Sequence, residues 1–203
     1  MSKNNMDDIY LNSSLTVIIT FLICVFSYYI IFNNYSLIKS KIDGNKYYVQ
    51  KKESLTDMSE TSDHIAKIVN RIKALIEHLK KTYPDDKRTI ILEKNFDPTS
   101  VLEAPIVKGQ TSYSINKGEK IMLCLRTRDE HEELIELNTM MFVTLHEIAH
   151  VCTVSIGHTE EFWENFKWIL EEAINIGIYS KQEFSKNPVN YCGMTISNSP
   201  IET

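Results

Sequence analysis

The residues with the clearest chemical potential are His146, Glu147 and His150, an HExxH pattern within residues 138–153. On an α-helix, residues four apart project from the same side, so both imidazoles can bind one Zn²⁺ while Glu147 faces an open coordination position. The flanking residues are mostly apolar, which predicts a buried helix. Buried histidines and a buried glutamate need partners, and a metal ion satisfies all three. The pattern predicts a hydrolytic zinc site with Glu147 as general base.

The third ligand should come from the residues that follow this helix. Gly157 is typical of the position just after a helix, where it turns the chain and presents His158, and Thr159 then caps a second helix. We expect His158 to be the third zinc ligand. A glutamate from the second helix is the alternative ligand. The candidates there are Glu164, Glu171 and Glu172.

The site must be positioned by the elements before it. Apolar residues at helical spacing predict a helix from Ser62 to Tyr83, which carries His64 and His78; both lack metal-like spacing and should be exposed or flanking. Residues 116–119 (Asn-Lys-Gly-Glu) predict a hairpin turn between the last two of four strands. The expected fold is α+β, a zincin-like domain in which a helix and a short mixed sheet precede the HExxH helix and a C-terminal helix. The four predicted strands are Arg88 to Leu92, Ser100 to Val107, Thr111 to Ile115 and Lys120 to Arg126.

The N-terminal region has a different character from the rest of the 203 residues. Residues 15–32 carry no charge and as a helix would span about 27 Å, so after a tail of residues 1–14 they predict a transmembrane helix. A cleaved signal peptide is the alternative, but no small-residue cleavage pattern follows. Polar residues 33–60 are expected to be a linker, followed by the catalytic domain at 61–203. Lysines are concentrated after the span, which predicts that this domain faces the cytoplasm.

Three cysteines lie outside the predicted span, at positions 124, 152 and 192. Their odd number and scattered spacing favour reduced thiols over a disulfide framework. Cys192 follows Tyr191 in a C-terminal turn-and-strand pattern that can return to the cleft. Cys192 could bind metal and Tyr191 could stabilise an oxyanion, but the pattern favours a plain buried thiol and a packed tyrosine ring.

Four motifs in a fixed order resemble the WLM-family metallopeptidases, relatives of the SprT-like proteases. They are the Asn116-Lys117-Gly118 hairpin, the LxLR strand at residues 123–126, HExxH, and HxxxFW at residues 158–163, and the resemblance covers about residues 62–178. It implies that His146, His150 and His158 bind zinc and that Glu147 is the general base. The better-known family members act on proteins crosslinked to DNA. A net charge of −5 and a sequence pI near 5.7 do not favour nucleic acid as a partner here, although the resemblance keeps it open.

The function predicted from these residues is that of a membrane-anchored, zinc-dependent endopeptidase. A protein or peptide substrate should lie antiparallel along residues 111–115, the strand expected at the sheet edge, with Tyr113 and Ser114 as contacts. Two alternatives stay open. One is a zinc-stabilised module that binds peptides without hydrolysis, and the other is a zinc amidase that acts on a non-protein substrate.

Overall fold

The computed structural model describes residues 15–26, 29, 33–107 and 109–202, in two units that divide after Ser36. In the N-terminal unit, residues 15–26 form a helix with exposed apolar side chains. The predicted transmembrane helix at residues 15–32 falls partly on residues 27–28 and 30–32, which lie outside the described part. Among the residues that are described, no helix combines the length and apolar character needed to cross a membrane. The predicted span therefore has no support from the structure.

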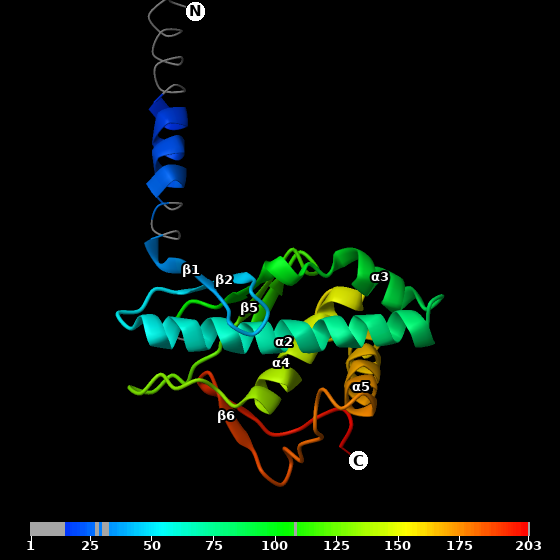
Figure 1. The fold of residues 1–203 in the computed structure, drawn as a ribbon. Helices are drawn as coiled ribbons and strands as arrows, with labels where there is room; N and C mark the ends of the chain where they lie inside the picture. Colours follow the sequence, from blue (N-terminus) through cyan, green and yellow to red (C-terminus); the bar gives the residue numbers. More distant parts are fainter. Residues whose placement is uncertain (1–14, 27–28, 30–32, 108, 203) are drawn as a thin grey trace, which may run out of the picture. The chain divides into compact units, whose positions relative to one another are not determined.

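The second unit, from Leu37 onward, contains the helices and sheets that surround the HExxH motif (Figure 1). Its elements confirm the α+β class. In chain order they are β1 (Tyr35–Lys39, which begins just before the boundary), β2 (Lys46–Gln50), α2 (Leu55–Thr82), α3 (Lys87–Asn95), the 3-10 turn η1 (Pro98–Ser100), β3 (Val101–Glu103), β4 (Tyr113–Ile115), β5 (Lys120–Leu123), α4 (Leu137–Cys152), α5 (Glu160–Asn175), β6 (Val189–Tyr191) and β7 (Met194–Ile196).

The segment 33–60 was expected to be a linker, and the structure contradicts this. It pairs β1 with β2 and contains the first turn of α2. In β2 the side chains alternate, so that Tyr47 and Val49 are buried against α2 and β3. The segment looked like a linker because a short strand buries only every second side chain, and its remaining residues are polar. The compact unit thus begins near residue 37.

Helix α2 is the longest element and packs against β2, β3, α3 and α4 (Figure 1). It begins where the Ser54 side chain accepts a hydrogen bond from the Asp57 backbone N–H, and its predicted apolar stripe is buried. The prediction that His64 is exposed or flanking was wrong, because it is only 9% exposed. The next segment, Arg88 to Leu92, was predicted to be a strand but lies in α3. The Asp86 carboxylate caps that helix by accepting from the Arg88 N–H.

A three-stranded mixed sheet has the order β3-β5-β4, with β3 parallel and β4 antiparallel to β5. This places β4 at the edge, as predicted. The hairpin between β4 and β5 turns through three residues with positive φ, the last of which is Gly118 at 106°. A Cβ atom there would come within 3.1 Å of the Asn95 carbonyl oxygen and 3.2 Å of the Val151 side chain. Glycine is therefore needed for the hairpin to approach α4 closely.

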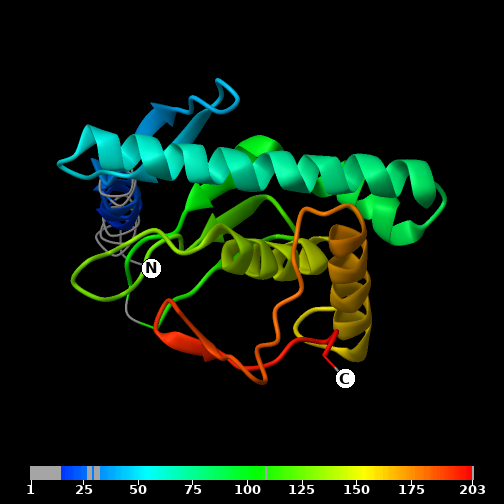
Figure 2. The ribbon, with the colours of Figure 1, turned by 60° about the horizontal axis from the view of Figure 1, so that its bottom comes forward.

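Helix α4 carries HExxH and lies at the centre of the unit, with most of its side chains buried. It contacts α2 and α3, and α5 packs against it as well. After α5 the chain returns to form the β6–β7 hairpin, which lies on the side of α4 away from α2 (Figure 2). The HExxH helix is thus covered by α2 and the sheet on one side and by the C-terminal hairpin on the other.

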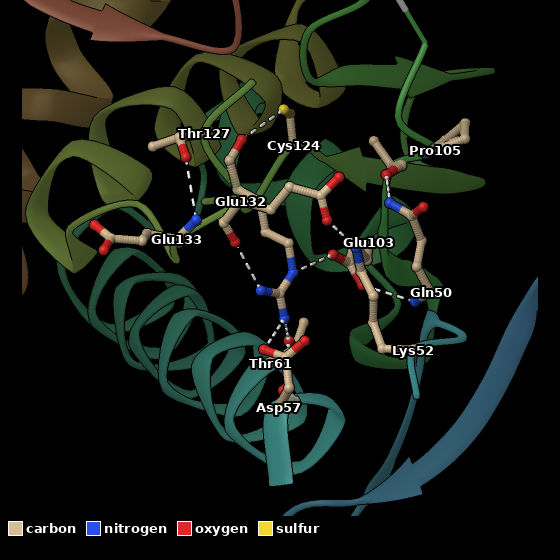
Figure 3. A network of polar contacts seen from close by, with 12 residues as sticks. Gln50, Lys52, Asp57, Thr61, Glu103, Pro105, Cys124, Thr127, Glu132 and Glu133 are labelled. Atoms are coloured by element: carbon tan, nitrogen blue, oxygen red, sulfur yellow. Dashed lines mark hydrogen bonds and ion pairs between the residues drawn. The ribbon is translucent and has the colours of Figure 1, made fainter. Parts of the chain in front are cut away.

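A buried polar network joins the end of the LxLR strand to α2 (Figure 3). Arg126, which is 5% exposed, donates from Nε to the buried Glu103 carboxylate at 3.2 Å. Its two terminal nitrogens donate to the Glu132 carbonyl oxygen at 2.9 Å, to the Asp57 carboxylate at 2.7 Å, and to the Thr61 hydroxyl. Every group that Arg126 meets is an acceptor, so one cation fastens β5, β3, α2 and the loop before α4 together.

The cysteine prediction was wrong, because Cys124 and Cys192 form a disulfide with their Cα atoms 6.4 Å apart. Cys24 and Cys152 are free thiols, the second of them buried. Cys192 lies at the turn of the β6–β7 hairpin, and Cys124 follows β5 directly. The two cysteines are 68 residues apart in the sequence, so their spacing gave no sign of the pairing. The bond fastens the C-terminal hairpin to the central sheet.

Candidate active site

Three histidine side chains converge in the structure. The Nε2 atom of His158 lies 3.1 Å from Nε2 of His146 and 3.2 Å from Nε2 of His150. His146 and His150 project from α4, one helical turn apart, as their spacing predicts. The structure therefore brings together the three residues that were expected to bind zinc, and in the described part of the chain they form the only cluster of metal-ligating type that we find.

His158 reaches this position through a firmly held loop between α4 and α5. Helix α4 ends at Cys152 with Thr153 as its C-cap, so Gly157 is not the residue that ends it. The positive φ of Gly157, 84°, turns the chain immediately before His158. The Glu161 carboxylate accepts hydrogen bonds from the backbone N–H groups of Val154 and Ser155. On the other side, the Lys117 ammonium donates to the carbonyl oxygens of Thr153 and Ser155. These contacts fix the backbone that carries His158.

The rival glutamate ligands lie elsewhere. The buried Glu172 carboxylate accepts at 2.7 Å from the Tyr83 hydroxyl and lies 2.7 Å from Nε2 of His78. Burial acts to raise the pKa of Glu172, but these two partners lower it below its ordinary value. Glu164 and Glu171 are exposed on α5 and are not in the histidine cluster. His78 is thus partly buried and paired with Glu172.

Two aromatic residues of the HxxxFW motif pack against the histidines. Phe162 stacks on the His150 ring with centroids 4.2 Å apart, and Trp163 stacks on the His158 ring at 5.7 Å. Thr159 caps α5 by accepting from the Phe162 N–H, as predicted. Because the cap sets where α5 begins, it also places both rings beside the imidazoles. The HxxxFW motif therefore has a physical explanation, since its two aromatic side chains orient the imidazole rings of His150 and His158.

Glu147 is 4% exposed and lines the same cleft as the three histidines. Burial raises its pKa to about 7, while hydrogen bonds from the hydroxyl and backbone N–H of Ser114 act in the opposite direction. Burial also lowers the pKa of His146 to about 3 and that of His150 to about 4, with neighbouring histidines as the next cause. Near neutral pH the two imidazoles are therefore uncharged and have lone pairs available for a cation.

The cleft has a volume of about 570 Å³ and runs between the β4 hairpin and the histidine cluster. Tyr113 and Ser114 line it, together with all three histidines and Glu147. Behind β4, the buried Tyr191 hydroxyl is hydrogen-bonded to Ser112, whose hydroxyl also accepts from the Cys124 N–H. Tyr191 therefore returns to the site region, as the tail pattern suggested, and its hydroxyl has a structural partner there.

Sequence reasoning missed the residues that hold the loop, Lys117 and Glu161, and the hydrogen bond from Ser114 to Glu147. Lys117 and Glu161 looked like ordinary polar residues of a turn and of a first helical turn. The only sequence signal for Lys117 was its place in the Asn-Lys-Gly-Glu turn, and the structure gives it a left-handed conformation with φ 57°.

The residues fit a zinc ion by the chemistry of the cluster. Tetrahedral zinc with bonds of about 2.0–2.1 Å to nitrogen places its ligands about 3.3 Å apart, close to the two observed Nε2 separations. A single cation at this point can accept a lone pair from all three Nε2 atoms at once. Three histidine ligands leave the fourth tetrahedral position open beside the Glu147 carboxylate. This is the pattern of catalytic zinc sites.

Comparison with known proteins agrees with these motifs. The WLM domain model matches residues 38–202. Uncharacterized protein R325 of Acanthamoeba polyphaga mimivirus is 31% identical over 171 residues, which is 82% of this chain and 85% of that protein. Uncharacterized protein 136R of Invertebrate iridescent virus 6 is 29% identical over 158 residues, covering 76% and 85% of the two chains.

Among solved structures, Wss1 from Saccharomyces cerevisiae aligns with a TM-score of 0.47 and 20% identity, over 63% of this chain and 86% of that one. The family model spans nearly the whole compact unit, including the end of β1 and all of β2, which precede the motifs. The chain belongs to the WLM domain family.

Proposed function

We propose that this protein is a zinc-dependent endopeptidase in which His146, His150 and His158 bind the metal and Glu147 is the general base. The observation that carries the proposal is the convergence of three Nε2 atoms at 3.1–3.2 Å beside a buried glutamate in an open cleft. A purely structural zinc site has no need of a carboxylate at an open position. Membership of the WLM family supports the same chemistry.

The chemistry can be divided between the metal and the chain. When bound, zinc supplies a Lewis acid that acidifies a water molecule and polarises the carbonyl group of the substrate. Glu147 takes the proton of the attacking water on a carboxylate oxygen and passes it to the nitrogen of the leaving amine. Burial raises the pKa of Glu147, which suits a group that must accept a proton and later return it. The Ser114 N–H and hydroxyl hold that carboxylate in place.

We propose that an extended peptide is bound antiparallel to β4. This edge strand has no partner strand on its outer side in the described sheet, and Tyr113 and Ser114 line the cleft beside the histidines. An edge strand can satisfy the backbone groups of a peptide, which then lies with a carbonyl group near the metal ligands. Since the Ser114 N–H is bonded to Glu147, Ser114 also positions the base. The acidic net charge gives no reason to propose nucleic acid as a partner.

Attachment to a membrane through residues 15–32, with the catalytic domain on the cytoplasmic side, stays a prediction from hydropathy and lysine distribution alone. It is tested by carbonate extraction of membranes and by protease treatment of sealed vesicles. Release of the full chain by carbonate would contradict the anchor. A C-terminus protected on the lumenal side would contradict the orientation.

Glu147→Gln tests the hydrolytic function directly. The variant should retain one zinc per chain and its peptide affinity but lose hydrolysis by at least about a hundredfold, because glutamine cannot accept the proton. The measurements are metal content by mass spectrometry, peptide binding by calorimetry and cleavage of a peptide library by the purified full chain. Glu164→Gln, an exposed change on α5, is the matched control and should behave as wild type.

Three outcomes separate the alternatives. Equal turnover in Glu147→Gln and wild type would refute the role of Glu147. Peptide binding without turnover in the wild-type protein would indicate a binding module. Hydrolysis of amides in non-protein compounds, with no cleavage of peptides, would indicate an amidase.

A further inference from the structure

A second cavity adjoins the histidine cluster between α4, α5 and the C-terminal hairpin. It has a volume of about 200 Å³ and shares His146 with the active-site cleft. The helices α4 and α5 form two of its walls, and the C-terminal hairpin β6–β7 closes the third. Its apolar lining includes Phe142, Val143, Trp163, Phe166, Met194 and Ile196.

The aromatic lining is continuous with the metal-binding histidines. Phe166 lies edge-on to the His146 ring at 5.1 Å between centroids, and Phe142 lies 5.3 Å from Phe166. Trp163 reaches both sites, since it stacks on His158 and lines the cavity. A group seated in this cavity therefore lies next to the atoms that would hold the zinc and not at a remote surface.

The chemistry and size of the cavity identify its occupant. The one buried polar side chain in the lining, Tyr191, already has its hydroxyl engaged by Ser112, so no buried group there calls for a polar partner. An apolar cavity of roughly 150 Å³ is enough to hold a benzene molecule. Trp163 and Met194 are 44% and 49% exposed, so the cavity opens to solvent and covering them would remove apolar surface from water.

We propose that this cavity binds one large apolar side chain of the substrate, such as leucine, methionine or phenylalanine, at the residue next to the scissile bond. Met194, Val143 and Trp163 are then specificity-determining residues. The inference rests on the proposed peptidase function and extends it from reaction type to substrate class. Two walls are rigid helices, whereas the third is the hairpin, which therefore sets how large a side chain can enter.

The test uses paired peptides that differ only in leucine or alanine at each position around the cleavage site, with the purified full chain. Wild type should favour leucine over alanine by at least about tenfold in kcat/KM at one fixed position, from the burial of the extra methyl and methylene groups. Met194→Trp, a change at an exposed position, should fill the cavity and reduce that ratio to near one. Ile90→Trp on α3 is the matched control and should keep the wild-type ratio, because Ile90 is 52% exposed and lines neither cavity nor cleft.

A binding measurement separates this proposal from the peptidase proposal. Zinc-loaded Glu147→Gln should bind the leucine peptide at least about tenfold more tightly than the alanine peptide, and adding Met194→Trp should remove the difference. If wild type hydrolyses nothing while this discrimination is present, the peptidase proposal fails and the pocket stands. Two results would refute the proposed pocket. One is cleavage with no preference between leucine and alanine at any position next to the scissile bond. The other is a preference that stays unchanged in both Met194→Trp and a folded Val143→Phe.

Discussion

Replacement of Arg126 by methionine should be among the most destabilising single changes in this protein. Arg126 and Glu103 are 5% and 2% exposed, so the change removes a guanidinium that donates to a buried carboxylate. Burial already raises the pKa of Glu103, and Arg126 is one of the groups that oppose this. Breaking a buried ion pair from one side costs about 3–5 kcal/mol. For a chain of this size that corresponds to a drop in Tm of roughly 6 to 20 °C.

The assay is urea unfolding at pH 7, followed by circular dichroism on wild type and three variants. Lys52→Met removes the cation of the Lys52–Glu132 pair at the rim of the same network, where the partners are 23% and 36% exposed, and should cost less than about 1 kcal/mol. The double variant Arg126→Met, Glu103→Met should recover part of the loss, because it removes both buried charges. The reasoning would be refuted if Arg126→Met cost no more than Lys52→Met, or if the double variant were less stable than Arg126→Met alone.

Three further predictions concern the metal, pH and the disulfide. His158→Ala should lower zinc affinity at least tenfold by competition with a chelating dye, whereas the exposed His131→Ala should not; equal affinity in both would remove His158 from the ligand set. Burial lowers the pKa of His64 to about 4, against about 6.5 in the unfolded chain. Between these two pH values the unfolded state binds more protons than the folded state. The free energy of unfolding should therefore fall by up to about 3 kcal/mol as the pH drops from 6.5 to 4. His64→Gln should flatten that part of the unfolding free energy curve, and an unchanged slope would contradict the assignment. Cys124→Ser should lower the free energy of unfolding by about 4 kcal/mol under oxidising conditions, because it opens the 68-residue loop that the disulfide closes. In reductant the same change should have no comparable effect. Cys152→Ser is the control for loss of a buried thiol.

Local signals in the sequence predicted the elements nearest the chemistry. The i, i+4 spacing of His146 and His150, the glycine of the β4–β5 hairpin and the Thr159 cap each act over a few residues, and the structure has all three features. Edge placement of β4 was also predicted correctly. These features depend on backbone geometry that neighbouring residues determine.

Predictions failed where partners come from distant parts of the chain. The β-branched residues of 88–92 suggested a strand, but the segment is a helix that packs against α4. Glu172 finds His78 and Tyr83 across about 90 residues, and Cys124 finds Cys192 across 68. Spacing carries no information about such pairs, because the fold and not the local chain brings them together.

The disulfide between Cys124 and Cys192 also determines what a cut in the backbone does. All three clustered histidines, Glu147 and the exposed loop around Ile156 lie between the two cysteines in the sequence. A single cleavage anywhere from residue 125 to 191 therefore leaves both fragments covalently joined, with every candidate ligand still on one molecule. Such nicks would be invisible on a non-reducing gel, and two bands would separate only after reduction.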